Sequence, residues 1–358
     1  MPEQPDRLRR KFVVRPPRNT LPTALRGARG LAAGLGCLAV VGCGAGPAAP
    51  DDAPVSLEAA SPATAMVDID QRFAGNWRLI HVDRLDADDR PLPPREAPAF
   101  GAPGAVGFLM YDPAGYMGVV IMQAEREPYA AQQPTADEAR LGLSSYTSYF
   151  GSYTIDEAEG IITHHVEGSL GPNGTGVDNR RAYEFVDDTL VLMPPRGASG
   201  EQLRLTWRRE PELPALTAEH RRFVGFWRYT SIERRAEDGE VLPAAAFETG
   251  VLMYTASGHM AVHLVRPDRQ PYAASPPVDA EVLAALGSYV SYFGPYTIHP
   301  DESLVVHDRI GNLSPAGVGT PARRGYEFVG DRLILQPPGT TVDGREVKSF
   351  LSWTRMSE

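Results

Sequence analysis

The sequence has almost no cysteine and almost no lysine, and each shortage excludes a class of protein. Cys37 and Cys43 are the only cysteines in 358 residues, so the chain beyond them can form no disulfide. Lys11 and Lys348 are the only lysines, and the first 42 residues carry a charge of +6 in a total of −10, so the remainder carries −16. The acidic part of the chain after residue 42 has no basic run to replace the counterions of a nucleic acid, so we expect no nucleic-acid partner.

Motifs of several enzyme classes are also missing. The sequence contains no Gly-x-Ser-x-Gly, no His-Glu-x-x-His and no phosphate-binding loop after a strand, which disfavours a covalent hydrolase and a nucleotide enzyme. His259 and His263 have the spacing of helical zinc ligands, but they lie in a strand-like run in which four residues span about 13 Å. We therefore expect no metal and no cofactor, and we interpret these two histidines as exposed or at a barrel rim.

The N-terminal segment has the three parts of an export signal. A basic stretch precedes a short apolar run from Leu31 to Val41, which is too short to span a bilayer. The run ends in Val40-Val41-Gly42-Cys43, which resembles the bacterial lipobox, where cleavage precedes a lipid-modified cysteine. Residues 1–42 are thus predicted to be a signal peptide and 43–70 a disordered tether. The prediction is an exported protein held at the cell envelope by a lipid on Cys43.

The second half of the chain repeats the first at an offset of 143 residues. The segment SYTSYFGSYTI at 145–155 recurs as SYVSYFGPYTI at 288–298, with nine of eleven residues identical. At the same offset GFLMY at 107–111 matches GVLMY, and RRAYEFV at 180–186 matches RRGYEFV. A unit of this length is a domain rather than a solenoid repeat, so we predict two tandem domains at 71–210 and 223–358, joined by a linker at 211–222. Each is expected to fold on its own.

Each copy is predicted to be all-β with one short helix. Runs rich in β-branched and aromatic residues alternate with turn signals, and Thr135 with Glu138 forms a capping box for a helix. The expected strands of the first copy are 76–84, 106–112, 115–124, 149–156, 160–168, 179–187, 189–194 and 202–209; the expected helices are 135–146 and, in the second copy, 278–289. Eight short strands favour a closed antiparallel barrel, which has no exposed edges.

The motifs of each copy occur together in one known family. An opening Gly-x-Trp-Arg, a Gly-x-Leu-x-Tyr strand, the hairpin Gly115-Tyr116-Met117, a Tyr-Phe-Gly-x-Tyr segment and the strand THHVEGS at 163–169 resemble the bacterial and fungal lipocalin-like domain family. The resemblance covers both copies from end to end. It implies two barrels, each with an internal pocket for a small, largely apolar molecule.

The candidate site follows from strand alternation. His165 and Glu167 share one face, opposite His164, and Arg181 shares a face with Tyr183. We interpret His165, Glu167 and Arg181 as an internal polar cluster. The candidate ligand contacts are Tyr111, Tyr149, His165, Glu167, Arg181 and Tyr183 in the first copy, and Tyr254, Tyr292, His307, Arg309, Arg324 and Tyr326 in the second. Here Arg309 is read as the counterpart of Glu167, and the first copy is expected to be the one that binds.

These observations favour a binding protein over an enzyme, with two alternatives. A noncovalent isomerase or cyclase would use His165 as general acid or base, oriented by Glu167. A barrel filled by its own side chains would instead serve as an interaction module. An open apolar cavity favours the first two functions, and a solid core favours the third.

Overall fold

The computed structural model describes residues 71–356 of the chain. The predicted signal peptide, the tether and Cys43 lie outside the described residues. Within the described range no helix is both long and apolar enough to cross a membrane.

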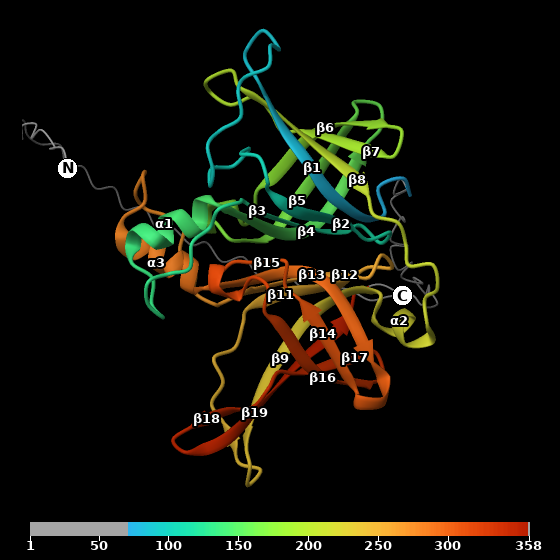
Figure 1. Ribbon diagram of the computed structural model, residues 1–358, viewed down its shortest axis with the longest axis vertical. Coiled ribbons are helices and arrows are strands. Elements are labelled where there is room, and N and C mark those ends of the chain that lie inside the picture. Colours follow the sequence, from blue (N-terminus) through green and yellow to red (C-terminus); the bar gives the residue numbers. More distant parts are fainter. Residues whose placement is uncertain (1–70, 357–358) are drawn as a thin grey trace, which may run out of the picture. The chain divides into compact units, whose positions relative to one another are not determined.

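The first copy is a closed antiparallel barrel of eight strands in sequence order (Figure 1). The strands are β1 (Gly75–Leu85), β2 (Val106–Tyr111), β3 (Tyr116–Met122), β4 (Tyr146–Asp156), β5 (Ile161–Ser169), β6 (Asp178–Val186), β7 (Thr189–Met193) and β8 (Gln202–Arg209). The ring closes where β1 pairs with β8, with Trp77 opposite Arg209. The predicted fold class is confirmed, and seven of the eight predicted strands begin within a residue or two of the observed ones.

The second copy forms the same ring, which closes where β9 pairs with β19. Its ring strands are β9 (Gly225–Ala236), β11 (Thr249–Tyr254), β12 (His259–Val265), β13 (Tyr289–His299), β14 (Leu304–Asp308), β16 (Pro321–Val329), β17 (Arg332–Gln336) and β19 (Arg345–Arg355). The short strands β10 (Val241–Leu242), β15 (Gly311–Asn312) and β18 (Thr340–Val342) are additions to this ring.

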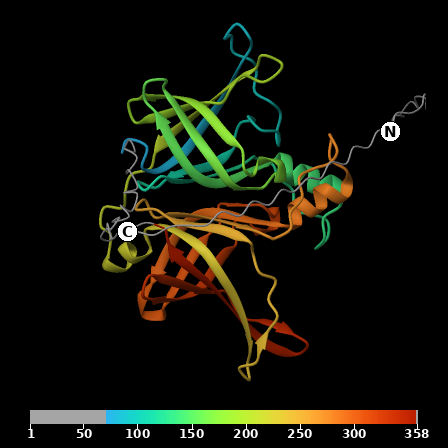
Figure 2. The same ribbon diagram turned by 180° about the vertical axis from the view of Figure 1, so that it is seen from behind.

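Short helices precede three of the strands. The helices α1 (Ala136–Ser144) and α3 (Asp279–Gly287) pack against each other, and both views show them side by side (Figures 1 and 2). The predicted capping box is present, since Thr135 accepts from the Glu138 amide and the Glu138 carboxylate accepts from the Thr135 amide. A third helix, α2 (Ala218–Phe223), lies in the predicted linker and was not foreseen. Single-turn 3-10 helices occupy 172–174, 300–302 and 315–317.

One difference from the sequence prediction is the start of β4, at Tyr146 rather than 149, because α1 ends at Ser144. Farther along β4 its register with β5 shifts between Phe150 and Gly151. A Cβ on Gly151 would lie 1.9 Å from the carbonyl oxygen of His165, so only glycine fits there. This accounts for the glycine in the repeated Tyr-Phe-Gly segment.

A phenylalanine fills one end of each barrel interior. Phe73 is fully buried, and its carbonyl accepts a 2.8 Å hydrogen bond from Nε1 of Trp77. Phe223, delivered by α2, is fully buried too and accepts from Trp227 over the same distance. The repeated opening segment thus forms the same plug in each copy.

A third apolar core lies between the barrels. β2 carries side chains buried on both faces, because Leu109 points into the first barrel while Phe108 and Met110 point toward the second. The shared core contains Phe108, Met110, Val120, Phe150 and Leu170 of the first copy and Phe226, Val251, Met253, Val265, Leu286 and Phe293 of the second, among others. The two copies are therefore joined through an interior and not by the linker alone, which revises the expectation of independent domains.

Two equivalent arginines fasten this interface. Arg126 donates from its two terminal nitrogens to the carbonyls of Asn312 and Leu313, at 2.7 and 2.6 Å. Its counterpart at the repeat offset, Arg269, donates to the carbonyls of Ser169 and Leu170, each at 2.5 Å. Burial lowers the pKa of both guanidinium groups, and the neighbouring tyrosines offset this effect only in part. Each guanidinium lies over a tyrosine ring. The contacts are reciprocal, as in a two-fold dimer.

Candidate functional site

A buried histidine lies between two tyrosines inside the first barrel. His164 on β5 is 1% exposed; its Nε2 is 2.7 Å from the hydroxyl of Tyr111 and its Nδ1 is 2.9 Å from that of Tyr149. Burial, reinforced by the charge of Arg181, lowers the pKa of His164 well below its usual value. The imidazole is therefore neutral, with one N–H and one acceptor nitrogen.

Both ring nitrogens of His164 are hydrogen-bonded to tyrosines. A neutral imidazole donates from one ring nitrogen and accepts at the other, so one of the two tyrosine hydroxyls donates to His164 and the other accepts from it. The Tyr149 hydroxyl also accepts a hydrogen bond from Arg181, whose guanidinium can only donate. Burial raises the pKa of Tyr149, against the opposing charge of Arg181, so this phenol remains protonated.

The second barrel repeats this arrangement. Nε2 of His307 is 2.7 Å from the Tyr254 hydroxyl, and Nδ1 is 3.0 Å from that of Tyr292. His307 is fully buried, and burial again lowers its pKa well below the usual value. The structure thus places four predicted site residues, Tyr111, Tyr149, Tyr254 and Tyr292, around two histidines. Of these histidines, His307 was predicted and His164 was assigned to the wrong face.

The placement of His165 and Glu167 in the pocket is wrong. His165 points outward, where its Nδ1 lies 2.7 Å from Asp178 and its Nε2 lies 2.9 Å from Thr154. Glu167 is also on the outside, in a 2.5 Å ion pair with Arg228 of the second copy. Strand alternation separates two faces without saying which is internal. The proposed acid and base of an isomerase therefore face away from the barrel interior.

The interpretation of Arg309 as the counterpart of Glu167 is also wrong. The sheet register pairs His164 with Tyr153 and His307 with Tyr296, which are equivalent positions. Counting from these histidines, Arg309 corresponds to Val166. Its Nε donates to the carbonyl of Thr320 at 2.7 Å, and its guanidinium lies over the ring of Tyr292 at 5.8 Å.

The remaining predicted residues of β6 and β16 face inward. Arg181 lines the interior of the first barrel, and the charge of its counterpart Arg324 acts on His307. Tyr183 packs edge-on against the Phe73 plug at 4.9 Å, and Tyr326 packs against Phe223 in the same way at 4.9 Å. The tyrosines therefore belong to the plugged end, while the arginines lie near the histidines.

The first barrel contains a cavity of about 260 Å³. Its walls are mostly apolar, formed by Phe100, Leu109, Val119, Ile121, Leu192, Pro194, Leu203, Leu205 and Trp207. Thr147, Tyr149, His164 and Arg181 contribute the polar part of the lining. We call this space the lumen cavity. It is not the solid core that a filled barrel would have.

The polar groups that the lumen cavity offers are hydrogen-bond donors. Arg181 pairs with no carboxylate of the described residues, and its guanidinium hydrogen-bonds the Tyr149 hydroxyl. The buried Nε1–H of Trp207 has no hydrogen-bond partner within residues 71–356. A buried donor without a partner is costly, so a ligand that supplies acceptors would be favoured here.

The loop that carries Phe100 is fixed to the barrel by charge. Glu201 accepts hydrogen bonds from Nε of Arg84 at 2.8 Å and from Arg95 at 2.9 Å. Arg95 in turn lies 3.3 Å from the carbonyl of Phe100. These contacts hold an aromatic side chain against the lumen cavity.

The interior of the second barrel has an additional aromatic side chain. Tyr229 stands where the first barrel has Leu79, two residues after the repeated tryptophan. Its ring packs on Trp353 at 5.7 Å and on Phe247 at 5.5 Å. The second barrel therefore has an aromatic contact at this position that the first barrel lacks.

A polar cluster is buried between the barrels. Oγ of Ser148 lies 2.8 Å from Nδ1 of His263, 3.2 Å from the Tyr289 hydroxyl and 3.0 Å from Oγ of Ser291. His263 is fully buried, so its interpretation as an exposed or rim histidine is wrong. Burial lowers its pKa to about 3. Residues 71–356 contain no group of three side chains able to hold a metal ion.

Comparison with known proteins agrees with this architecture. A family model described as a lipocalin-like domain matches residues 74–210 and again 224–356. No curated protein matches the chain.

Solved structures match only distantly. A redesigned β-barrel is 12% identical and covers 40% of this chain and 99% of its own, with a TM-score of 0.23. A protein of unknown function from Nostoc punctiforme is 10% identical, covers 80% of this chain and 97% of its own, and has a TM-score of 0.21. The match to transferrin binding protein B from Haemophilus parasuis has 10% identity, covers 71% of this chain and 54% of that protein, and has a TM-score of 0.21. Scores this low carry no argument about function.

Proposed function

Because the chain belongs to the lipocalin-like domain family, we propose that its first barrel binds a small, largely apolar molecule in the lumen cavity. The observation that carries the proposal is the composition of that cavity, which has apolar walls and a few converging polar groups. Ligand sites in proteins have this composition, since apolar walls supply affinity and a few polar groups fix orientation.

The polar groups define the part of the ligand that they would contact. Arg181 supplies a cation, Trp207 supplies an N–H donor without a partner, and Tyr149 supplies a hydroxyl that can donate. A carboxylate or a similar acceptor-rich group would accept from all three, and a charge-assisted bond to arginine is the strongest of them. The proposed ligand is therefore an apolar molecule with one acceptor-rich end.

The volume limits how much of the ligand the lumen cavity holds. At about 30 Å³ for each water, 260 Å³ corresponds to about nine waters. A short-chain acid such as hexanoate has a similar number of heavy atoms. The cavity alone therefore suits a short chain or a single ring.

Adjacent arginines allow a matched test. In Arg181→Gln the charge-assisted contact is lost, so we expect hexanoate to bind about 10 to 100 times more weakly in calorimetric titration of the full chain. Arg180 points outward on the same strand, where it pairs with Glu159 at 2.9 Å, so Arg180→Gln should bind normally. Equal affinities of the two variants would refute the proposed site.

We also propose that the chain is exported and held at the cell envelope by a lipid on Cys43. The support is the lipobox-like Val40-Val41-Gly42-Cys43 and the segment after it, which has few large apolar residues. Mass spectrometry of the mature N-terminus should find residue 43 first and carrying a diacylglyceryl group. An unmodified thiol, or cleavage elsewhere, would contradict this.

A further inference from the structure

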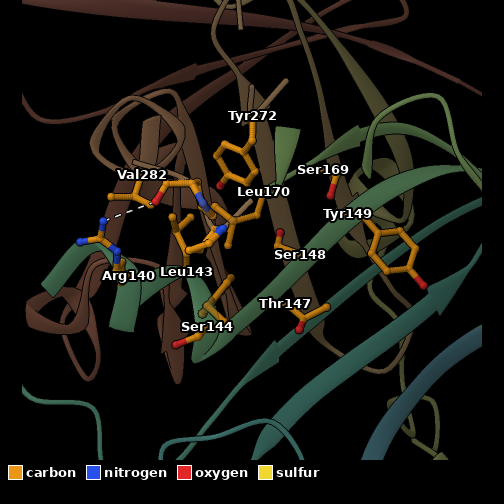
Figure 3. A pocket seen from close by; sticks show the side chains of 14 residues that line it. Arg140, Leu143, Ser144, Thr147, Ser148, Tyr149, Ser169, Leu170, Tyr272 and Val282 are labelled. Atoms are coloured by element: carbon orange, nitrogen blue, oxygen red, sulfur yellow. Dashed lines mark hydrogen bonds between the residues drawn. The ribbon is translucent and has the colours of Figure 1, made fainter. Parts of the chain in front are cut away.

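A second cavity, of about 470 Å³, lies between α1, β4 and the segment before α3. Its apolar side chains come from both copies and include Leu143, Leu170, Tyr272, Pro277 and Val282 (Figure 3). We call it the inter-barrel groove. Nothing in the proposed function of the first barrel requires it.

The groove and the lumen cavity have two wall residues in common, Thr147 and Tyr149. In Figure 3 these two lie at one side of the groove, and the Tyr149 hydroxyl points away from the other lining residues. That hydroxyl bonds His164 inside the barrel. One tyrosine therefore contacts both spaces and presents its polar end to the lumen cavity.

We propose that the two cavities form one site for an elongated amphipathic acid. Its carboxylate contacts Arg181 and Tyr149, and its chain passes Thr147 into the groove against Leu143 and Val282. This inference rests on the proposed function of the lumen cavity and extends it to a substrate class, long-chain carboxylic acids. The two shared wall residues, with donors on the lumen side and mostly apolar side chains on the groove side, are the observation that favours one amphipathic occupant for both spaces.

In this arrangement the second copy contributes residues to the binding site of the first. Tyr272, Pro276, Pro277 and Val282 belong to it, and they line the groove beside a barrel to which they do not belong. The reciprocal arginine contacts and the shared core hold these residues in place. The second barrel thus completes the binding site of the first, although its own interior carries the larger Tyr229.

The test uses a series of straight-chain acids, namely hexanoate, decanoate and dodecanoate, titrated into the full chain. Each methylene transferred from water to an apolar wall should raise affinity by about fourfold, and the gain should continue past hexanoate. Leu143→Asp places a charge in the groove and should weaken dodecanoate by at least about tenfold while hexanoate is unchanged. Leu141 lies on the same helix and is 45% exposed, so Leu141→Asp is the matched control.

The outcomes separate this inference from the proposed function. If affinity stops rising beyond hexanoate, or if Leu143→Asp leaves dodecanoate binding equal to that of Leu141→Asp, the groove is not part of the site. The lumen proposal would stand in that case, provided that Arg181→Gln still weakens hexanoate. If Arg181→Gln has no effect on any acid, both proposals are wrong.

Discussion

Three buried histidines make the stability of the molecule depend on pH. His164, His307 and His263 are each at most 1% exposed, and burial lowers the pKa of all three. In the unfolded chain their pKa returns to about 6.5. Below about pH 6.5 the three imidazoles therefore stay neutral in the folded protein but take up protons in the unfolded chain.

Stability should fall as the pH falls below about 6.5. The unfolded chain then binds protons that the folded chain does not. Each buried histidine therefore lowers the free energy of unfolding by about 1.4 kcal/mol for each pH unit below about 6.5. For His263 this decrease continues down to its folded pKa of about 3. Urea unfolding at about pH 7.5 and about pH 5.5 measures this difference.

A single substitution tests the contribution of His263. The first copy has Val120 at the equivalent position, so His263→Val should reduce the pH dependence by about one third while the fold is kept. A variant with an undiminished dependence would show that His263 is not buried and neutral.

The sequence predicted which residues share a strand face better than it predicted which face lies inside the barrel. Alternation correctly grouped Arg181 with Tyr183, but it placed His165 inside in place of His164. The repeat itself contained the missing signal, because the 143-residue offset pairs His164 with His307 and His165 with Asp308. The histidine that both copies share is the buried one.

The strands were predictable because β-branched and aromatic runs end at clear turn signals. The shared core between the barrels was not predicted, yet a signal was present. The runs GFLMY and GVLMY are apolar at successive positions and do not alternate, which is typical of a strand buried on both faces. In an isolated barrel one of those faces would be in water.

The bulge in β4 gives a prediction about one backbone position. In Gly151→Ala the new Cβ would meet the His165 carbonyl oxygen at 1.9 Å, so we expect a loss of about 3 kcal/mol in unfolding free energy. Gly171→Ala is the control, since nothing lies within 4 Å of its Cβ. Thermal or urea unfolding compares the two. Equal stabilities would mean that the bulge is absent.

The reciprocal interface changes what the separated halves should do. Residues 71–210 alone would expose Phe108, Met110 and Phe150, each worth about 1.5–3 kcal/mol of burial. Arg126 can reach Ser169 and Leu170 of a second identical copy, just as Arg269 reaches them now. We therefore expect the isolated first copy to be a homodimer by light scattering, and adding residues 211–358 should convert it to a one-to-one complex. A stable monomer would contradict a shared core.

The measurement that tests the central claim most directly is a crystal structure of the full chain with hexanoate. The account predicts the carboxylate within hydrogen-bond distance of the Arg181 guanidinium, the Tyr149 hydroxyl and Nε1 of Trp207, and the chain against the apolar wall of the lumen cavity on the side of Thr147. A lumen cavity that stays empty at saturating hexanoate, or one filled by the barrel's own side chains, would contradict it.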